Sequence, residues 1–104
     1  MMAVMVAEDS GFEALSAATA DEAIKILESR SDIRLVFTDV NVPGSMNGLR
    51  LAHAVRDRWP PVELLVTSAF GNVTAKDLPA RGRFLSKPYD VATLSETFQQ
   101  MAGD

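Results

Sequence analysis

The chain of 104 residues contains no cysteine and only one histidine. Without cysteine there are no disulfides, no thiolate nucleophile and no cysteine-ligated metal site. His53 alone cannot build a zinc site, which needs several nitrogen or sulfur ligands. Basic residues are also few, because ten lysines and arginines stand against fourteen acids and leave a formal charge of −4. This balance argues against binding nucleic acid or an anionic membrane through bulk charge.

Long hydrophobic runs are missing as well. The opening MMAVMVAEDS has a short apolar run and no basic leader, which excludes a secretory signal and a membrane span. With 47% hydrophobic and 23% charged residues, the composition is typical of a soluble globular protein of this length. The sequence therefore predicts a single cytoplasmic domain over residues 1–104, with no membrane association and no attached output domain.

Strand-like and helix-like segments alternate along the chain. Apolar runs and alternating apolar positions predict strands at residues 12–18, 33–37, 62–67 and 83–86. Apolar residues at helical spacing predict helices at residues 19–29, 47–59 and 90–102. Thr19 followed by Glu22 forms a capping box at the first of these helices. The alternation of strands and helices indicates a parallel α/β sheet with helices on both faces.

Three of the predicted strands end at polar side chains. Asp39 comes just after residues 33–37, Thr67 ends residues 62–67, and Lys87 follows residues 83–86. Ligands bind at the carboxyl ends of the strands in an open parallel sheet, so we expect these side chains to converge. A carboxylate can attack a phosphoryl group, and a hydroxyl and an ammonium suit the transferred oxygens. Each residue alone fits an ordinary structural role, and only the combination predicts phosphoryl transfer.

The segments that carry these residues resemble a known family. VFTDVNVPGSMNGL, LLVTSA and RFLSKPYD are similar, in the same order, to the three signature segments of receiver domains of two-component response regulators. The resemblance implies a flavodoxin-like, doubly wound parallel sheet in the order 2-1-3-4-5. It also implies a phosphoprotein of a phosphorelay that takes a phosphoryl group from a histidine kinase or phosphotransfer protein and switches conformation. Such a domain is a signalling module and not an enzyme.

The resemblance assigns a role to each matching residue. Asp39 corresponds to the phosphoacceptor, Thr67 to the switch hydroxyl and Lys87 to the phosphate-binding lysine. Phe84 matches the aromatic switch position, and Pro88 matches a cis-proline.

The family also binds Mg²⁺ through the phosphoacceptor, a backbone carbonyl that corresponds to Asn41, and an acidic pair at the end of its first strand. Glu8 and Asp9 are candidates for that pair, but they lie too close to residues 12–18 for a parallel crossover with its helix. We therefore interpret residues 1–9 as the end of the first helix. The first strand and the acidic pair are then missing, the Mg²⁺ site is incomplete, and binding is weak or absent.

An alternative for the first residues is that AVMVA pairs antiparallel with FEALSA across an EDSG turn. Without the first strand, unpaired backbone edges favour a homodimer or a strand-exchanged oligomer. The segment SAFGNVTAKDLPARG, with its glycines and proline, predicts a short or irregular fourth helix.

Two other functions fit part of the pattern. The missing acids favour an interaction module with a receiver-like fold that works without phosphorylation. Phosphatases of the haloacid-dehalogenase type share the Asp, Thr or Ser, and Lys set, but they place a second acid where this chain has Asn41.

Overall fold

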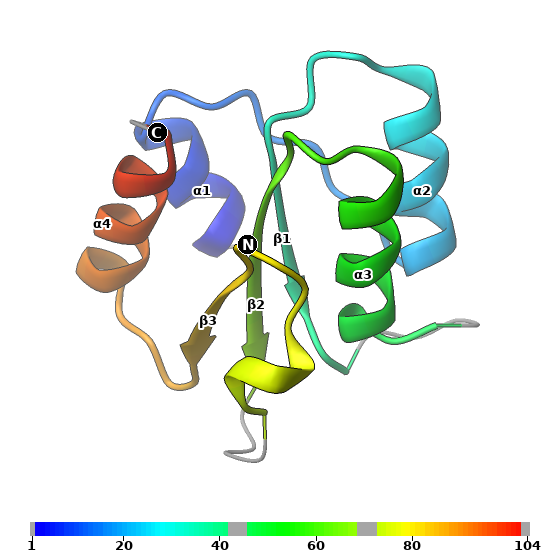
Figure 1. Cartoon of the computed structure of the whole chain (residues 1–104). Helices are drawn as coiled ribbons and strands as arrows, with labels where there is room; N and C mark the ends of the chain where they lie inside the picture. Colours follow the sequence, from blue (N-terminus) through cyan, green and yellow to red (C-terminus); the bar gives the residue numbers. More distant parts are fainter. Residues whose placement is uncertain (1, 42–45, 69–72, 103–104) are drawn as a thin grey trace. The chain divides into compact units, whose positions relative to one another are not determined.

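The structure, a computed structural model, describes residues 2–41, 46–68 and 73–102 (Figure 1). The elements in chain order are α1 (Met2–Asp9), α2 (Ala20–Ser29), β1 (Leu35–Asp39), α3 (Gly48–Arg58), β2 (Glu63–Ser68), the 3₁₀ turn η1 (Ala75–Asp77), β3 (Arg83–Ser86) and α4 (Val91–Ala102). They divide into two compact units, a sheet unit of residues 17–87 and a helical unit of residues 1–16 and 88–104.

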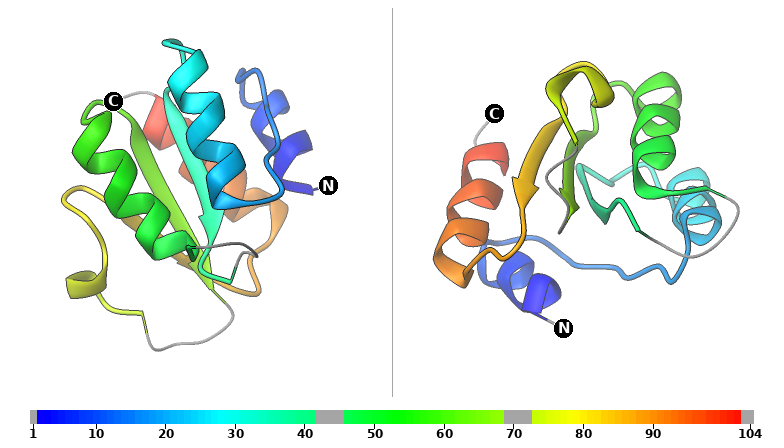
Figure 2. Two further views of the ribbon diagram at one scale, coloured as in Figure 1. Left: turned by 90° about the vertical axis from the view of Figure 1, so that its right-hand side faces the viewer. Right: turned by 90° about the horizontal axis from the view of Figure 1, so that it is seen from below.

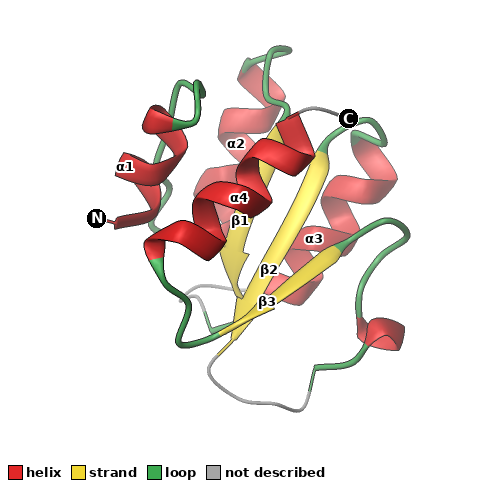
Figure 3. Cartoon of the chain, turned by 90° about the vertical axis from the view of Figure 1, so that its left-hand side faces the viewer, coloured by secondary structure: helices red, strands yellow, loops and turns green. Residues whose placement is uncertain are grey.

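The sheet unit contains three parallel strands in the order β1-β2-β3 (Figure 3). The register places Asp39 opposite Thr67, and Thr67 opposite Leu85. Helices α2 and α3 lie side by side over one face of this sheet (Figure 2). Because all three strands run in the same direction, their carboxyl ends form one common edge.

Alternate residues of the central strand β2 pack against α2 and α3 and form the core between the sheet and these two helices. Successive side chains of a strand point to opposite faces, so one face of β2 can be wholly apolar. The buried residues of this core cluster are Ala20, Leu27, Leu51, Ala52, Val55, Val62, Leu64 and Val66. Fully burying one leucine or valine side chain contributes roughly 1.5–3 kcal/mol, so this cluster is the main stabilising feature of the sheet unit.

Both helices of the sheet unit begin at polar caps. The side chain of Thr19 accepts a hydrogen bond from the backbone N–H of Glu22 at 3.1 Å. The side chain of Asn47 accepts one from the backbone N–H of Arg50 at 2.9 Å. Each cap satisfies a backbone donor that the first turn of a helix leaves without a partner. The predicted start of the helix at Thr19 is therefore confirmed.

The helical unit packs α1 against α4. The rings of Phe12 and Phe98 meet edge to face, with centroids 6.2 Å apart. Helix α1 ends at Asp9, and Gly11 in the turn that follows has a φ of 95°, in the left-handed region that glycine adopts without steric cost. The N–H of Phe12 then donates to the carbonyl of Ala7 at 3.0 Å and closes the helix end. The helix predicted for residues 1–9 is confirmed over residues 2–9, residue 1 lying outside the described residues, and the antiparallel hairpin is wrong.

The strand predicted at residues 12–18 is also wrong, because none of these residues belongs to a strand. A strand needs a neighbour with which to exchange backbone hydrogen bonds. In the order 2-1-3-4-5 the second strand pairs only with the first, and no strand precedes residue 12 in the described chain. Residues 12–18 therefore lack a neighbouring strand with which to pair, despite their weakly alternating apolar pattern.

Two smaller points concern the remaining elements. Strand β1 begins later than predicted and runs through Asp39, so this residue ends the strand rather than following it. In the segment expected to hold a short or irregular fourth helix, the one helical element of the described residues is the 3₁₀ turn η1. No helix within residues 2–41, 46–68 and 73–102 has the length and hydropathy needed to cross a bilayer.

The cap of α2 can be tested by replacing Thr19 with alanine. The substitution removes the side-chain oxygen that accepts from the N–H of Glu22, and we expect the free energy of unfolding to fall by about 1 kcal/mol. Urea denaturation followed by the fluorescence of Trp59, the only tryptophan, measures this change. Thr19→Ser keeps the hydroxyl and should unfold close to the wild type. Equal destabilisation by both substitutions contradicts the cap.

Candidate functional site

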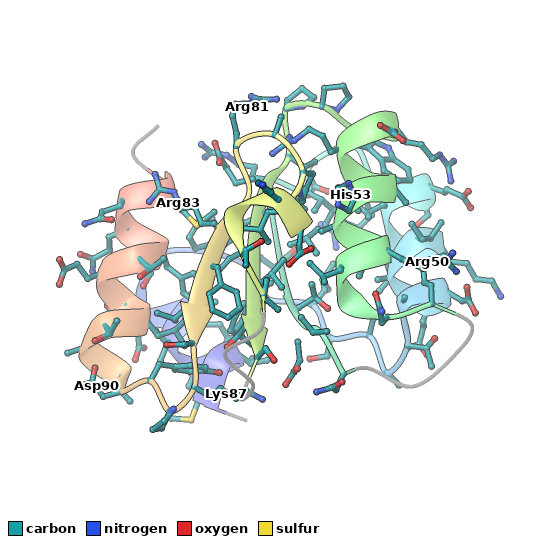
Figure 4. The ribbon with its side chains drawn as sticks, turned by 60° about the horizontal axis from the view of Figure 1, so that its bottom comes forward. Arg50, His53, Arg81, Arg83, Lys87 and Asp90 are labelled. Carbon is teal, nitrogen blue, oxygen red and sulfur yellow. The ribbon has the colours of Figure 1, made fainter. Side chains whose placement is uncertain are left out.

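The carboxyl edge of the sheet brings Asp39 and Lys87 into contact. Asp39 ends β1 and Lys87 follows β3, with β2 between the two strands. The ammonium of Lys87, seen near the end of β3 in Figure 4, forms an ion pair with Oδ2 of Asp39. The backbone N–H of Lys87 donates to the carbonyl of Ser68 at 3.0 Å, which holds the lysine at this level of the sheet.

Both carboxylate oxygens of Asp39 accept hydrogen bonds. Besides the bond from Lys87 to Oδ2, the backbone N–H of Asn41 donates to Oδ1 at 3.0 Å. Desolvation raises the pKa of Asp39, but the hydrogen bonds from Lys87 and Asn41 and the charge of Lys87 outweigh it and hold the pKa below its usual value. With 28% of its side chain exposed, Asp39 is an ionised carboxylate that a partner can reach. These are the requirements for a carboxylate nucleophile.

Thr67 lies opposite Asp39 in the register but uses its hydroxyl elsewhere. The side chain is buried, and its hydroxyl donates to the carbonyl of Leu85 on β3 at 2.6 Å. The hydroxyl thus links β2 to β3 in this structure. It has to release the carbonyl of Leu85 before it can donate to a group bound on Asp39.

The remaining residues assigned by resemblance lie on β3 and just after it. Phe84 is opposite Val66 and packs against the core cluster, on the face covered by α2 and α3. Pro88 follows Lys87 as the first residue of the second segment of the helical unit. The switch role of Phe84 and the cis peptide bond at Pro88 stay predictions.

Gly48, which the sequence did not single out, fixes the backbone around Asp39. A Cβ atom at Gly48 would overlap the carbonyl oxygen of Asp39 and lie 2.9 Å from Oγ1 of Thr38. The N–H of Gly48 donates to the carbonyl of Val40 at 2.9 Å, so the first residue of α3 presses directly on the end of β1. A glycine at the first position of a helix, where better helix formers are available, was the only signal of this contact.

The described residues do not fit a Mg²⁺ site. Mg²⁺ demands octahedral oxygen coordination, in which carboxylates supply charge. Here the carboxylate of Asp39 is already bonded by an ammonium, and the carbonyl of Asn41 carries no charge. Glu8 and Asp9 end helix α1 in the helical unit, rather than a strand of the sheet. No group of three or more histidine, aspartate or glutamate side chains that could hold a metal occurs among the described residues.

Comparison with known proteins shows the class to which this fold and site belong. The sequence profile of the response regulator receiver domain matches residues 1–99. The chain therefore belongs to the family of response regulator receiver domains, and its fold is the flavodoxin-like α/β fold of that family. It is a receiver domain of two-component signalling.

Particular relatives agree with this assignment. The response regulator protein FleR of Pseudomonas aeruginosa is 33% identical over 81% of the chain, and the nitrogen assimilation regulatory protein NtrX of Azorhizobium caulinodans is 32% identical over 86%. The chain spans only 18% and 20% of the lengths of these proteins. The crystal structure of the receiver domain of NtrX from Brucella abortus superposes with a TM-score of 0.78 at 29% identity, covering 95% of this chain and 88% of that one.

The contact between Gly48 and Asp39 predicts an unusual response to alanine. A glycine-to-alanine change inside a helix ordinarily stabilises by about 0.5–1 kcal/mol. For Gly48→Ala we expect the opposite sign, a loss of roughly 1–3 kcal/mol, because the new methyl group must displace the end of β1. Urea denaturation measures the change. Arg50→Ala, at an exposed position of the same turn, is the control and should stay within about 0.5 kcal/mol of the wild type. A Gly48→Ala variant as stable as the wild type contradicts the contact.

The Asp39–Lys87 pair predicts a loss of stability in acid. The pKa of Asp39 is lower in the folded chain than in the unfolded chain, so the unfolded chain takes up the proton first as the pH falls. The stabilisation is therefore fully present above about pH 4 and is lost as the pH falls through the folded pKa. We expect the difference in unfolding free energy between wild type and Asp39→Asn to be constant near neutral pH and to shrink in this acid range.

Lys87→Gln is the matched control for this titration. It removes the cation and one hydrogen bond to Asp39, so the same acid-dependent loss should be smaller in this variant. A difference between wild type and Asp39→Asn that is independent of pH would show that the pair does not lower the pKa of Asp39.

Proposed function

We propose that Asp39 is the phosphoacceptor of this receiver domain and takes its phosphoryl group from a histidine kinase or a phosphotransfer protein. The observation that supports this best is the ionised, partly exposed carboxylate of Asp39 beside the ammonium of Lys87. In this role the chain is a phosphoprotein and a signalling module, and the enzyme that phosphorylates it is its partner. A cytoplasmic location and a single domain over residues 1–104 are part of the same proposal.

The transfer forms one bond and breaks one. An oxygen of Asp39 attacks the phosphorus of a phosphohistidine, the new O–P bond forms as the P–N bond breaks, and the leaving imidazole takes a proton from water. The product is an acyl phosphate on Asp39. Lys87 has three donors on a flexible stem, so its ammonium can follow the developing charge onto the phosphoryl oxygens.

In this proposal Thr67 changes its hydrogen-bond partner when Asp39 is phosphorylated, and this alters the contact between β2 and β3. Its hydroxyl now donates to the carbonyl of Leu85, and a phosphoryl oxygen on Asp39 offers a stronger, charged acceptor. When the hydroxyl turns to that acceptor, β2 and β3 lose their side-chain link. Loss of this link frees β3 to shift, and Phe84, the neighbour of Leu85 on β3, would move with the strand.

One observation favours a second candidate function. Because the described site does not fit Mg²⁺, we expect transfer to Asp39 to be slow, and an interaction module that works without phosphorylation is the alternative. The dimer or strand-exchanged oligomer predicted from the sequence suits either role. A phosphatase of the haloacid-dehalogenase type has no support, because Asn41 stands where its second acid belongs.

Labelling with acetyl phosphate tests the phosphoacceptor. We expect slow addition of one phosphoryl group, visible in the intact mass, and little acceleration by Mg²⁺, because the charge of Lys87 disfavours a cation beside Asp39. Asp39→Asn should take up no phosphoryl group under the same conditions.

Three other outcomes are informative. Labelling that survives in Asp39→Asn assigns the acceptor to another residue. Saturable Mg²⁺ binding that disappears in Asp39→Ala shows that further acids complete the metal site. A folded wild-type chain that takes up no label, with or without Mg²⁺, favours the interaction module.

A further inference from the structure

Two arginines meet at the end of the sheet opposite Asp39. Arg56 lies near the end of α3, and Arg81 lies in the turn before β3. Figure 4 shows Arg81 and Lys87 at opposite ends of β3. Nη1 of Arg56 and Nη2 of Arg81 both donate to the carbonyl oxygen of Pro60, the latter at 3.1 Å. Two guanidinium groups are therefore held next to each other at the amino-terminal edge of the sheet.

Both groups keep unused hydrogen-bond donors. A guanidinium has five N–H donors. Arg56 uses Nε for the carbonyl of Ala80 at 2.7 Å and Nη1 for the carbonyls of Pro60 and Val62, the latter at 2.8 Å. Within the part of the chain that the structure describes, Nη2 of Arg56 and both Nε and Nη1 of Arg81 form no hydrogen bond. The hydrogen bonds to backbone carbonyls thus orient the two guanidinium groups and leave some of their N–H donors available for a ligand.

Their positive charge is only partly compensated. Among the described residues, no carboxylate forms an ion pair with Arg56 or Arg81. Burial and the charge of Arg81 lower the pKa of Arg56, and the charge of Glu63 acts in the opposite direction. Glu63 is the acid that offsets the repulsion, and it does so from beyond ion-pair distance. This end of the sheet is locally positive in a chain whose formal charge is −4.

The backbone at Arg81 is strained. Its φ of 62° lies in the left-handed region, where a residue with a Cβ atom is disfavoured and glycine is the usual choice. The turn itself is held by the N–H of Gly82, which donates to the carbonyl of Pro79 at 2.9 Å. Glycine at position 81 would relieve the strain, so arginine at this position lowers the stability of the folded chain relative to glycine. Strain of this kind points to a use for the side chain.

We infer that Arg56 and Arg81 form a binding site for an oxyanion, a phosphate or carboxylate group, at the amino-terminal edge of the sheet. Planar guanidinium groups present paired N–H donors that match two oxygens of such a group. Because contacts to Pro60, Val62 and Ala80 already orient the two side chains, little rotamer freedom is lost on binding. A bound anion also offsets the repulsion between the two cations.

Titration with inorganic phosphate, followed by backbone amide shifts in two-dimensional NMR, tests the site. Sodium chloride keeps the ionic strength constant, so that general screening is excluded. We expect saturable shifts around residues 56–62 and 79–83. In Arg81→Gly the binding should weaken by at least about tenfold, since most of the unused donors are removed. Acetate titrated in the same way distinguishes a site for phosphate alone from one that also takes carboxylates.

Further variants separate binding from a structural role. Arg81→Gly should be at least as stable as the wild type without phosphate, because the strain at position 81 is relieved. Glu63→Gln removes the partly compensating acid and should bind phosphate more tightly. Arg50→Ala removes an exposed arginine elsewhere on α3 and should bind as the wild type does. Phosphate shifts that are absent, or equal in the wild type and Arg81→Gly, overturn the inference.

Discussion

Parallel pairing along both edges of β2 positions the functional site. It aligns Asp39, Thr67 and Leu85 in one row across three strands. Lys87 follows two residues after Leu85, and its backbone N–H bonds to Ser68 at the end of β2. The ammonium can then reach across the central strand to Asp39. A shift of the register by one residue would turn these side chains to the opposite face and separate them.

The ion pair at this edge matters more for chemistry than for stability. Asp39 and Lys87 keep 28% and 36% of their side chains exposed, and partly exposed pairs contribute little to folding because water screens them. The same pair keeps the carboxylate ionised and places a cation where phosphoryl oxygens would gather. The ammonium of Lys87 also occupies the place beside Asp39 in which a metal cation would otherwise be favourable. One interaction therefore explains both the suitability for phosphoryl transfer and the poor fit for Mg²⁺.

The two ends of the sheet differ in how charge is held. At the carboxyl edge a lysine is paired with an acid, whereas at the amino edge Arg56 and Arg81 are bound to backbone carbonyls. Carbonyl oxygens orient a guanidinium but cannot neutralise it. The charge, which Glu63 offsets only in part, therefore remains available at the end of the sheet opposite Asp39. Because the three strands run parallel, their carboxyl ends lie together at one end of the sheet and their amino ends at the other.

The sequence by itself determined those features that depend on neighbouring residues. The cap at Thr19, the apolar run of β2 and the candidates Asp39 and Lys87 all follow from local patterns. Only the tertiary structure decided that residues 12–18 form no strand, because a strand exists only with a partner. It also decided that Gly48 presses on the carbonyl of Asp39. The meeting of Arg56 with Arg81, like that contact, joins residues distant in sequence, and the path of the backbone through space decides such contacts.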